Sequence, residues 1–163
     1  MTIKIVDYSK EYSKGALDAW NEVVEAGDAF PQENKMDLNE SIDFFTSQSR
    51  TAIAIDEETN KVLGLYILHP NNVGRCGHIS NASYAVLKEA RGKGIGEMLV
   101  KDCMASAKAL GFKILQFNAV VANNIAAINL YRKLGFKQLG VIEGGFRNKN
   151  GDYVAIIPHY INL

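Results

Sequence analysis

The residues with the clearest chemical potential form a glycine-rich loop, Arg91-Gly92-Lys93-Gly94-Ile95-Gly96. Apolar, strand-like residues 83–87 precede this loop, and an amphipathic helical pattern over residues 95–110 follows it. Amide N–H groups in the first turn of a helix have no partner within the helix, and the helix dipole is positive at that end. The loop therefore predicts an anion-binding site, and a cofactor phosphate is the favoured anion.

The spacing of the glycines separates this loop from two common phosphate-binding loops. A P-loop requires Ser or Thr after a Gly-Lys pair, and none follows Gly92-Lys93 here. A dinucleotide-binding fingerprint reads GxGxxG soon after the first strand, whereas these glycines read GxGxG more than half way along the chain. The pattern that is present is Arg-x-x-Gly-x-Gly, formed by Arg91, Gly94 and Gly96.

A second conspicuous segment follows, with Asn124, Ala127 and then the run Leu-Tyr-Arg-Lys-Leu-Gly-Phe over residues 130–136. Together with Ala85-Val86 before the glycine loop, the two segments resemble the cofactor-binding motifs of the GCN5-related N-acetyltransferase family, in the same order. The matching region runs from about Gly77 to the C-terminus. The resemblance implies direct transfer of an acetyl group from acetyl-CoA to an amine in a ternary complex.

The resemblance also implies a role for each part of the cofactor site. The amides of the glycine loop would hold the pyrophosphate, and the strand edge at residues 85–87 would pair with the pantetheine arm. The N–H of Val86 or Leu87 would bind the thioester carbonyl and stabilise its oxyanion. Tyr131 would be the general acid that protonates the departing thiolate. The predicted cofactor residues are Ala85, Val86, Leu87, Arg91, Gly92, Lys93, Gly94, Ile95, Gly96, Glu97, Asn124, Ala127, Tyr131 and Lys133.

The acceptor side of the site is less clear from the residues. The strand expected over residues 78–87 has no carboxylate, which leaves His78 or Glu33 as candidates for the base. Asn81 and Asn118 are predicted to lie in the two strands that flank the cleft. Residues 78–82 and 116–121 are similar to segments of N-acetyltransferases that act on proline analogues such as azetidine-2-carboxylate, in which the matching asparagines hold the substrate. The predicted substrate-binding residues are Asn81, Asn118 and Phe30.

The composition narrows the classes of partner. The 163 residues predict a single domain, and the resemblance implies that it is an N-acetyltransferase domain over 1–163. Equal numbers of acidic and basic residues, 18 each, give no general attraction to nucleic acid or to anionic membranes. No apolar run approaches the ~20 residues of a membrane span. The two cysteines, Cys76 and Cys103, have no metal-binding spacing, so no metal is expected and free thiols in the cytoplasm are predicted.

The elements that must position these residues follow an order typical of the resembled family. The predicted fold is α/β (α+β): a mixed, mostly antiparallel sheet of about seven strands with about four flanking helices. The resemblance further implies that the sheet splays open between its fourth and fifth strands. Strands are expected over residues 2–7, 51–56, 62–69, 78–87, 113–121, 138–147 and 153–161, and helices over 9–25, 38–47 (with Asn39 as N-cap), 95–110 and from Asn123 or Asn124 to 135.

Three functions remain open at this stage. The leading one is acetylation of a small-molecule amine or amino acid. The second is acetylation of a protein N-terminus or lysine, for which an open and often acidic peptide groove is expected. The third is a non-catalytic CoA-binding regulatory module. A homodimer is a further option, because the last hairpin offers strand edges that are able to pair between subunits.

Overall fold

The computed structural model describes all 163 residues, and its centre is a seven-stranded sheet with the order β1-β2-β3-β4-β5-β9-β6. Only β4 and β5 run parallel, so the predicted mixed and mostly antiparallel sheet is confirmed. Strands β7 and β8 pair separately as a small two-stranded sheet. The strands are β1 (Ile3–Asp7), β2 (Arg50–Asp56), β3 (Lys61–Pro70), β4 (Ile79–Val86), β5 (Ile114–Phe117), β6 (Lys137–Gln138), β7 (Ile142–Arg147), β8 (Tyr153–Ile156) and β9 (His159–Asn162).

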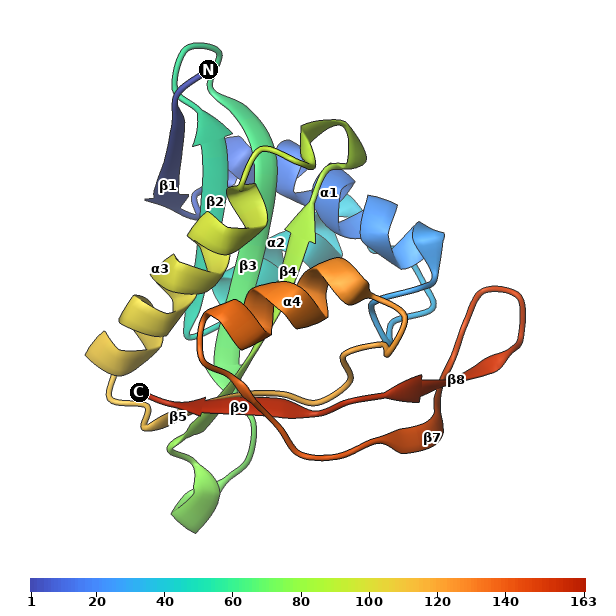
Figure 1. The fold of residues 1–163 in the computed structure, drawn as a ribbon. Helices are drawn as coiled ribbons and strands as arrows, with labels where there is room; N and C mark the ends of the chain where they lie inside the picture. The colour runs from blue at the N-terminus through green and yellow to red at the C-terminus, as the bar shows by residue number, and fades with distance from the viewer.

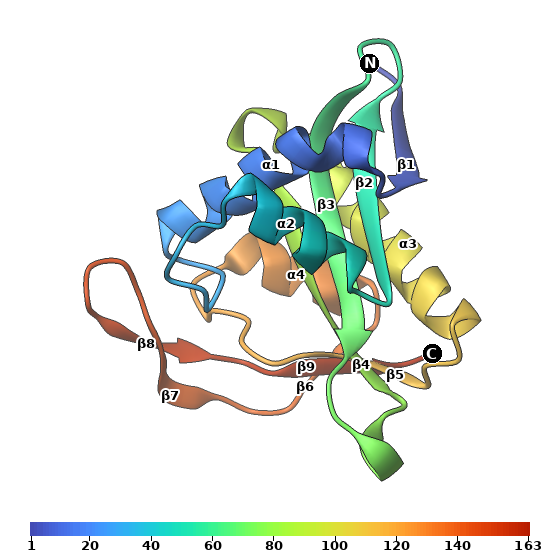
Figure 2. The same cartoon turned by 180° about the vertical axis from the view of Figure 1, so that it is seen from behind.

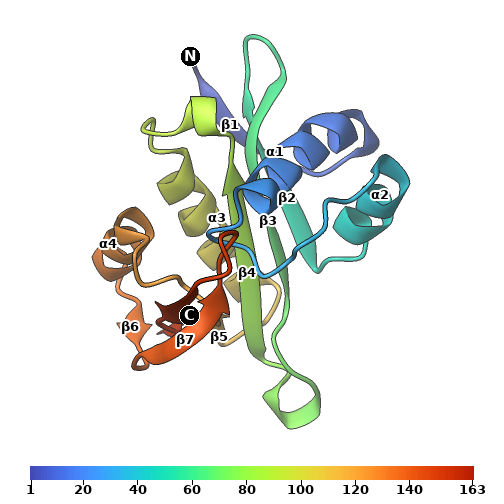
Figure 3. The ribbon, with the colours of Figure 1, turned by 90° about the vertical axis from the view of Figure 1, so that its right-hand side faces the viewer.

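Four α-helices cover the two faces of the sheet. Helices α1 (Ser13–Ala26) and α2 (Leu38–Thr46) lie on one face, and α3 (Ile95–Ala109) and α4 (Ile125–Lys133) lie on the other (Figures 1 and 2). The side view shows the sheet between the two pairs of helices (Figure 3). Three short 3-10 turns, η1 (Lys10–Tyr12), η2 (Gly74–Cys76) and η3 (Lys88–Ala90), complete the elements.

Each face of the sheet has its own hydrophobic core, and each core holds in place one side of the region that carries the predicted functional residues. On the α1 face, Trp20 is 1% exposed and its ring lies 4.4 Å from that of Phe30, which anchors the loop between α1 and α2. On the α3 face, Leu99, Cys103 and Leu115 are fully buried between the helix and the sheet. The loops that carry functional residues therefore start from rigid elements.

The sheet opens between β4 and β5, as expected. The two strands pair only at Ile79 with Ile114, Ser80 with Leu115 and Asn81 with Gln116. Beyond Asn81, β4 continues to Val86 while it is paired with β3 alone. Because β5 ends at Phe117, the second half of β4 has an unpaired edge that faces a gap.

Two expected boundaries are wrong. The N-cap of α2 is Asp37 rather than Asn39, since the Asp37 carboxylate accepts the Glu40 N–H (2.8 Å) while the Glu40 carboxylate accepts the Asp37 N–H (3.0 Å). This reciprocal capping box satisfies two N–H groups that would otherwise be unpaired at the helix start. The strand expected over residues 113–121 ends at Phe117, so Asn118 follows the strand instead of lying in it.

The final hairpin is also more broken than the sequence pattern predicted. The expected strand over 138–147 is split into β6 and β7, with Gly140 between them at φ 119°. The expected strand over 153–161 is split into β8 and β9, with Pro158 between them. Since proline has no N–H to donate, it interrupts the ladder there. The two breaks let β9 join the main sheet while β7 and β8 extend toward the α1–α2 loop (Figure 1).

Candidate active site

The glycine loop leaves a row of amides without partners at the start of α3. Gly92 (φ 79°) and Gly94 (φ 78°, the N-cap) adopt left-handed conformations that favour glycine. The first helical hydrogen bond joins the Met98 N–H to the Gly94 carbonyl (3.1 Å), and the amides of residues 92–97 have no acceptor within the chain. A β-carbon added at Gly92, Gly94 or Gly96 would meet no atom within 4 Å. The loop thus presents open space and N–H donors, which fit a phosphate.

A groove of about 510 Å³ extends from this loop between β4 and α4, and it brings the two sequence motifs together. Its walls also include Asp28 and Ala29 from the α1–α2 loop, which the sequence did not predict. The predicted cofactor residues that line it are Val86, Arg91, Gly92, Gly94, Ile95, Gly96, Asn124, Ala127 and Tyr131. Asn124 caps α4 by accepting the Ala127 N–H through Oδ1 (3.3 Å), which leaves its Nδ2 free to donate.

The pairing of β4 with β3 decides which strand amides face the gap. The Leu87 N–H donates to the Leu63 carbonyl (2.9 Å), so it is not available to a thioester, and that half of the expectation is wrong. Hydrogen-bonding direction alternates along an antiparallel strand, so the N–H groups of Tyr84 and Val86 point toward the gap instead. Neither amide has an acceptor within the chain. The amide of Tyr84 is therefore a candidate that sequence reasoning missed.

Five predicted cofactor residues lie outside the groove. Ala85 is 1% exposed and packs toward α1 in the opposite core, and the amide of Leu87 is used as described. Lys133 donates to Glu97 (2.9 Å), which also pairs with Lys101 (3.0 Å), and these two lysines lower the pKa of the Glu97 carboxyl. Lys93 is exposed and does not line the groove. Lys133 is thus bound to a carboxylate rather than directed at the groove.

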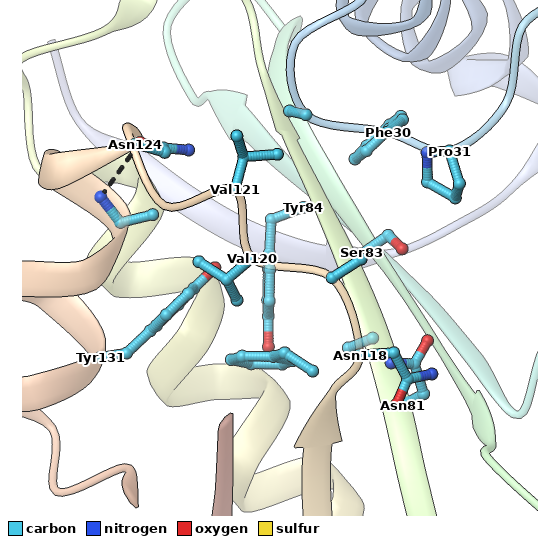
Figure 4. A pocket seen from close by; sticks show the side chains of 15 residues that line it. Phe30, Pro31, Asn81, Ser83, Tyr84, Asn118, Val120, Val121, Asn124 and Tyr131 are labelled. Carbon is cyan, nitrogen blue, oxygen red and sulfur yellow. Dashed lines mark hydrogen bonds between the residues drawn. The ribbon is translucent and has the colours of Figure 1, made fainter. Parts of the chain in front are cut away.

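A second cavity, of about 190 Å³, adjoins the groove and holds all three predicted substrate residues (Figure 4). Phe30 comes from the α1–α2 loop, Asn81 from β4 and Asn118 from the end of β5. Ser83 and Pro31 complete that wall, and Ser83 lies on the same face of β4 as Asn81 because side chains alternate along a strand. The cavity and the groove share Ala29, Tyr84, Asn124, Ala127 and Tyr131, so this is where donor and acceptor would meet.

Side-chain amides make the polar end of this cavity. Asn81 Nδ2 donates to the Gln116 carbonyl (2.8 Å), which leaves Asn81 Oδ1 free to accept. Asn118 Nδ2 donates to Asn71 Oδ1 (2.7 Å), while Asn118 Oδ1 accepts from Gln116 Nε2 (3.1 Å). Asn118 is exposed. Figure 4 shows the two asparagines side by side.

Two tyrosines stand at the junction of cavity and groove. Tyr131 packs its ring against Phe117 (centroids 4.7 Å apart), and its hydroxyl points toward Val120 (Figure 4). The Tyr84 hydroxyl is buried without a hydrogen-bond partner, near Cys103. Burial raises the pKa of both phenols above the usual value, so both stay protonated at neutral pH. Burial also raises the pKa of the Cys103 thiol to about 12, which makes it a poor nucleophile.

The two candidates for a base lie outside the cavity. Glu33 forms an ion pair with Arg147 in a third, polar groove of about 840 Å³ that runs between the α1–α2 loop and the β7–β8 hairpin. His78 precedes β4 at the other end of the strand and lines none of these three spaces. No cluster of three or more His, Cys, Asp or Glu side chains is arranged to bind a metal ion. None of the helices has the length and apolar character that crossing a membrane requires.

Comparison with known proteins identifies the family. Residues 17–136 match the profile of the acetyltransferase (GNAT) family. N-acetyltransferase aca1 of Schizosaccharomyces pombe is 35% identical over 157 residues, which cover 86% of this chain and 75% of that protein. The chain therefore belongs to the acetyltransferase (GNAT) family. It is an N-acetyltransferase, and acetyl-CoA is its cofactor.

Solved structures agree with this fold. A GCN5-related N-acetyltransferase from Kribbella flavida superposes with a TM-score of 0.90 at 29% identity, covering 99% of this chain and 98% of the other. A phosphinothricin acetyltransferase from Sinorhizobium meliloti, solved in complex with acetyl-CoA, gives 0.91 at 23% identity, covering 100% of this chain and 89% of the other.

Proposed function

We propose that this acetyltransferase transfers the acetyl group to the amine of a small molecule or free amino acid, which attacks acetyl-CoA directly in a ternary complex. The observation that carries the proposal is the cavity of about 190 Å³ at the inner end of the groove, closed by Phe30 and provided with polar contacts by Asn81 and Asn118. A space of this volume accommodates a small acceptor. The free Oδ1 of Asn81 is suited to accept an N–H of the acceptor.

The same proposal assigns the cofactor contacts. The pyrophosphate binds the unpaired amides of residues 92–97, with Arg91 close by. The pantetheine arm lies along the open edge of β4, and Asn124 donates to it through Nδ2. The Tyr84 or Val86 amide holds the thioester carbonyl, and this hydrogen bond strengthens as the carbonyl becomes an oxyanion. Tyr131, at the junction, protonates the departing thiolate.

A second candidate is acetylation of a peptide or protein N-terminus, and one observation favours it. The third groove shares Phe30 and Pro31 with the acceptor cavity, so it offers a path for a chain that continues beyond the acetylated residue. Its charges are mixed, however, with Glu25 and Glu33 beside Lys35, Arg147 and Lys149. It therefore lacks the acidic character that suits a lysine-rich peptide. We rank this function below acetylation of a small amine, and a non-catalytic CoA-binding role below both.

The test is a thiol-release assay with acetyl-CoA and a panel of amines. The panel contains free amino acids, azetidine-2-carboxylate, polyamines and short peptides with free N-termini. Turnover of a small amine or amino acid at higher kcat/KM than any peptide supports the proposal. A peptide preference moves the assignment to the second candidate. Tight acetyl-CoA binding with no turnover of any amine would favour the regulatory role.

A further inference from the structure

Every side chain that lines the acceptor cavity is uncharged. The polar atoms come from amide and hydroxyl groups, and the rest of the wall is alanine, valine, proline and phenylalanine. These groups belong to Asn81, Asn118, Asn124, Ser83 and Tyr131, while Tyr84 lines the cavity with its hydroxyl buried near Cys103.

Apart from the two tyrosines, the charged and titratable groups around the cavity lie outside its lining. Asp28 lines the cofactor groove, and Glu33 pairs with Arg147 in the third groove. On the sheet, the His159 ring is buried beside Tyr131 and bonds through Nδ1 to the Ile157 carbonyl (2.7 Å). The remaining neighbours, which also lie outside the cavity lining, are His69 on β3, His78 before β4, and Arg132 and Lys133 on α4.

These surroundings discriminate between the two protonation states of an amine. An ammonium ion loses hydration when it enters a small apolar cavity, and no carboxylate is present in the lining to offset that cost. The two phenols do not supply a negative charge either, because burial raises the pKa of both Tyr84 and Tyr131. An uncharged amine pays a much smaller desolvation cost and finds the amide oxygen of Asn81 free to accept one of its N–H groups.

We propose that the acceptor enters the cavity as the uncharged amine, taken from its own acid–base equilibrium in solution, and that no side chain of the protein removes its proton before attack. This inference rests on the proposed function and specifies its substrate class: small amines that are weakly basic. At pH 7 about 10% of an amine with a pKa near 8 is uncharged, against about 0.04% of one with a pKa near 10.4. Between acceptors of equal fit, the weaker base presents roughly 200-fold more of the uncharged form at that pH, and its lower intrinsic nucleophilicity offsets part of this gain in rate.

The reaction is balanced in protons without a base supplied by the enzyme. The amine nitrogen forms a bond to the thioester carbon, the carbon–sulfur bond breaks, and the electron pair leaves with the CoA sulfur. The nitrogen then gives up one proton, and the thiolate accepts one, through the Tyr131 hydroxyl that lies at the junction of cavity and groove. An uncharged amine and acetyl-CoA therefore yield the amide and CoA thiol with no net proton exchanged with the protein.

The experiment measures kcat/KM against pH for one active acceptor and for its fluorinated analogue, whose shape is similar and whose amine is less basic. The expected result is a tenfold rise per pH unit up to the pKa of each amine, so that the break moves with the acceptor. Glu33→Gln and His78→Gln should keep both the slope and the break. A break that stays at one pH for both acceptors, or that disappears in either variant, would overturn the inference.

A binding measurement separates this inference from the proposed function. Calorimetric titration of the same amines into the protein with CoA bound, in two buffers of different ionisation enthalpy, counts protons released per amine. At a pH well below the pKa of the amine, release of one proton per amine bound supports uptake of the uncharged form. If such release is seen but no amine turns over, the proposed function fails and this inference stands. No proton released, or no amine bound, overturns the inference. Asn118→Asp, which adds a carboxylate to the lining, should reduce the release and make the pH profile shallower.

Discussion

Replacing Gly96 by alanine should stabilise the protein and weaken its affinity for the cofactor. Gly96 is the second residue of α3, its φ lies outside the left-handed region, and a β-carbon there would meet no atom within 4 Å. Because glycine in a helix costs about 0.5–1 kcal/mol relative to alanine, Gly96→Ala should raise the free energy of unfolding by about that amount. For a chain of this length the melting temperature should rise by roughly 1–4 °C.

The same methyl group would occupy the space that a phosphate needs. If the pyrophosphate binds the amides of residues 92–97, the methyl group should remove at least one charge-assisted hydrogen bond, worth about 1.5–3 kcal/mol. The Kd for CoA should therefore rise roughly 10- to 150-fold. Thermal unfolding without ligand measures the first effect, and calorimetric titration with CoA measures the second.

Gly111→Ala provides the reciprocal control. Gly111 follows the end of α3 at φ 93° and lies outside the groove, so alanine there should cost about 1–2 kcal/mol of stability and leave the Kd for CoA unchanged. The reasoning would be refuted if Gly96→Ala lowered the melting temperature of the free protein, since the glycine would then serve the fold. It would equally be refuted if this variant bound CoA as tightly as the unchanged protein.

Three further predictions concern the acceptor side and the buried phenols. Tyr131→Phe should lower kcat about 10²- to 10⁴-fold with little change in the KM for acetyl-CoA, because the hydroxyl has no partner in the chain to lose. If steady-state kinetics show an unchanged kcat, Tyr131 takes no part in proton transfer. Asn81→Ala and Asn118→Ala should each raise the KM for the acceptor about tenfold and leave that for acetyl-CoA unchanged; no effect of either would mean that the acceptor binds elsewhere. Burial raises the pKa of Tyr66, Tyr84 and Tyr131 in the folded protein. The stability that comes from keeping these phenols protonated is therefore complete at pH values below the unfolded pKa of about 10, and it is lost as the pH rises above that value. Phenolate absorbance from them should appear only with unfolding, and its appearance while near-ultraviolet circular dichroism stays native would contradict this.

Local signals predicted the parts of the molecule that local forces build. The glycine loop, the start of α3 and the cap of α4 at Asn124 depend on residues close together in the sequence, and each lies where the pattern placed it. The gap beside β4 was predicted from the resemblance to a family, because periodicity alone does not report which strands pair.

Non-local pairing accounts for what the sequence missed. Whether Leu87 or Tyr84 offers a free amide depends on the register of β4 against β3, and no local pattern encodes that register. The contact of Lys133 with Glu97 joins two helices that are distant in the sequence. Asn118 is exposed because β5 stops pairing after Phe117, although the apolar run in the sequence continues.

Because side chains and backbone amides alternate in direction along β4, this one strand faces both the acceptor cavity and the gap. Asn81 and Ser83 face the acceptor cavity, while the amides of Tyr84 and Val86 face the gap where the donor would lie. A slip of one residue would exchange these assignments throughout the strand. This register leaves no room for a side chain at Gly64 of β3, where a β-carbon would come within 2.7 Å of the Ala85 carbonyl oxygen. A side chain at Gly64, which lines neither cavity nor groove, would therefore disturb recognition of both substrates at once.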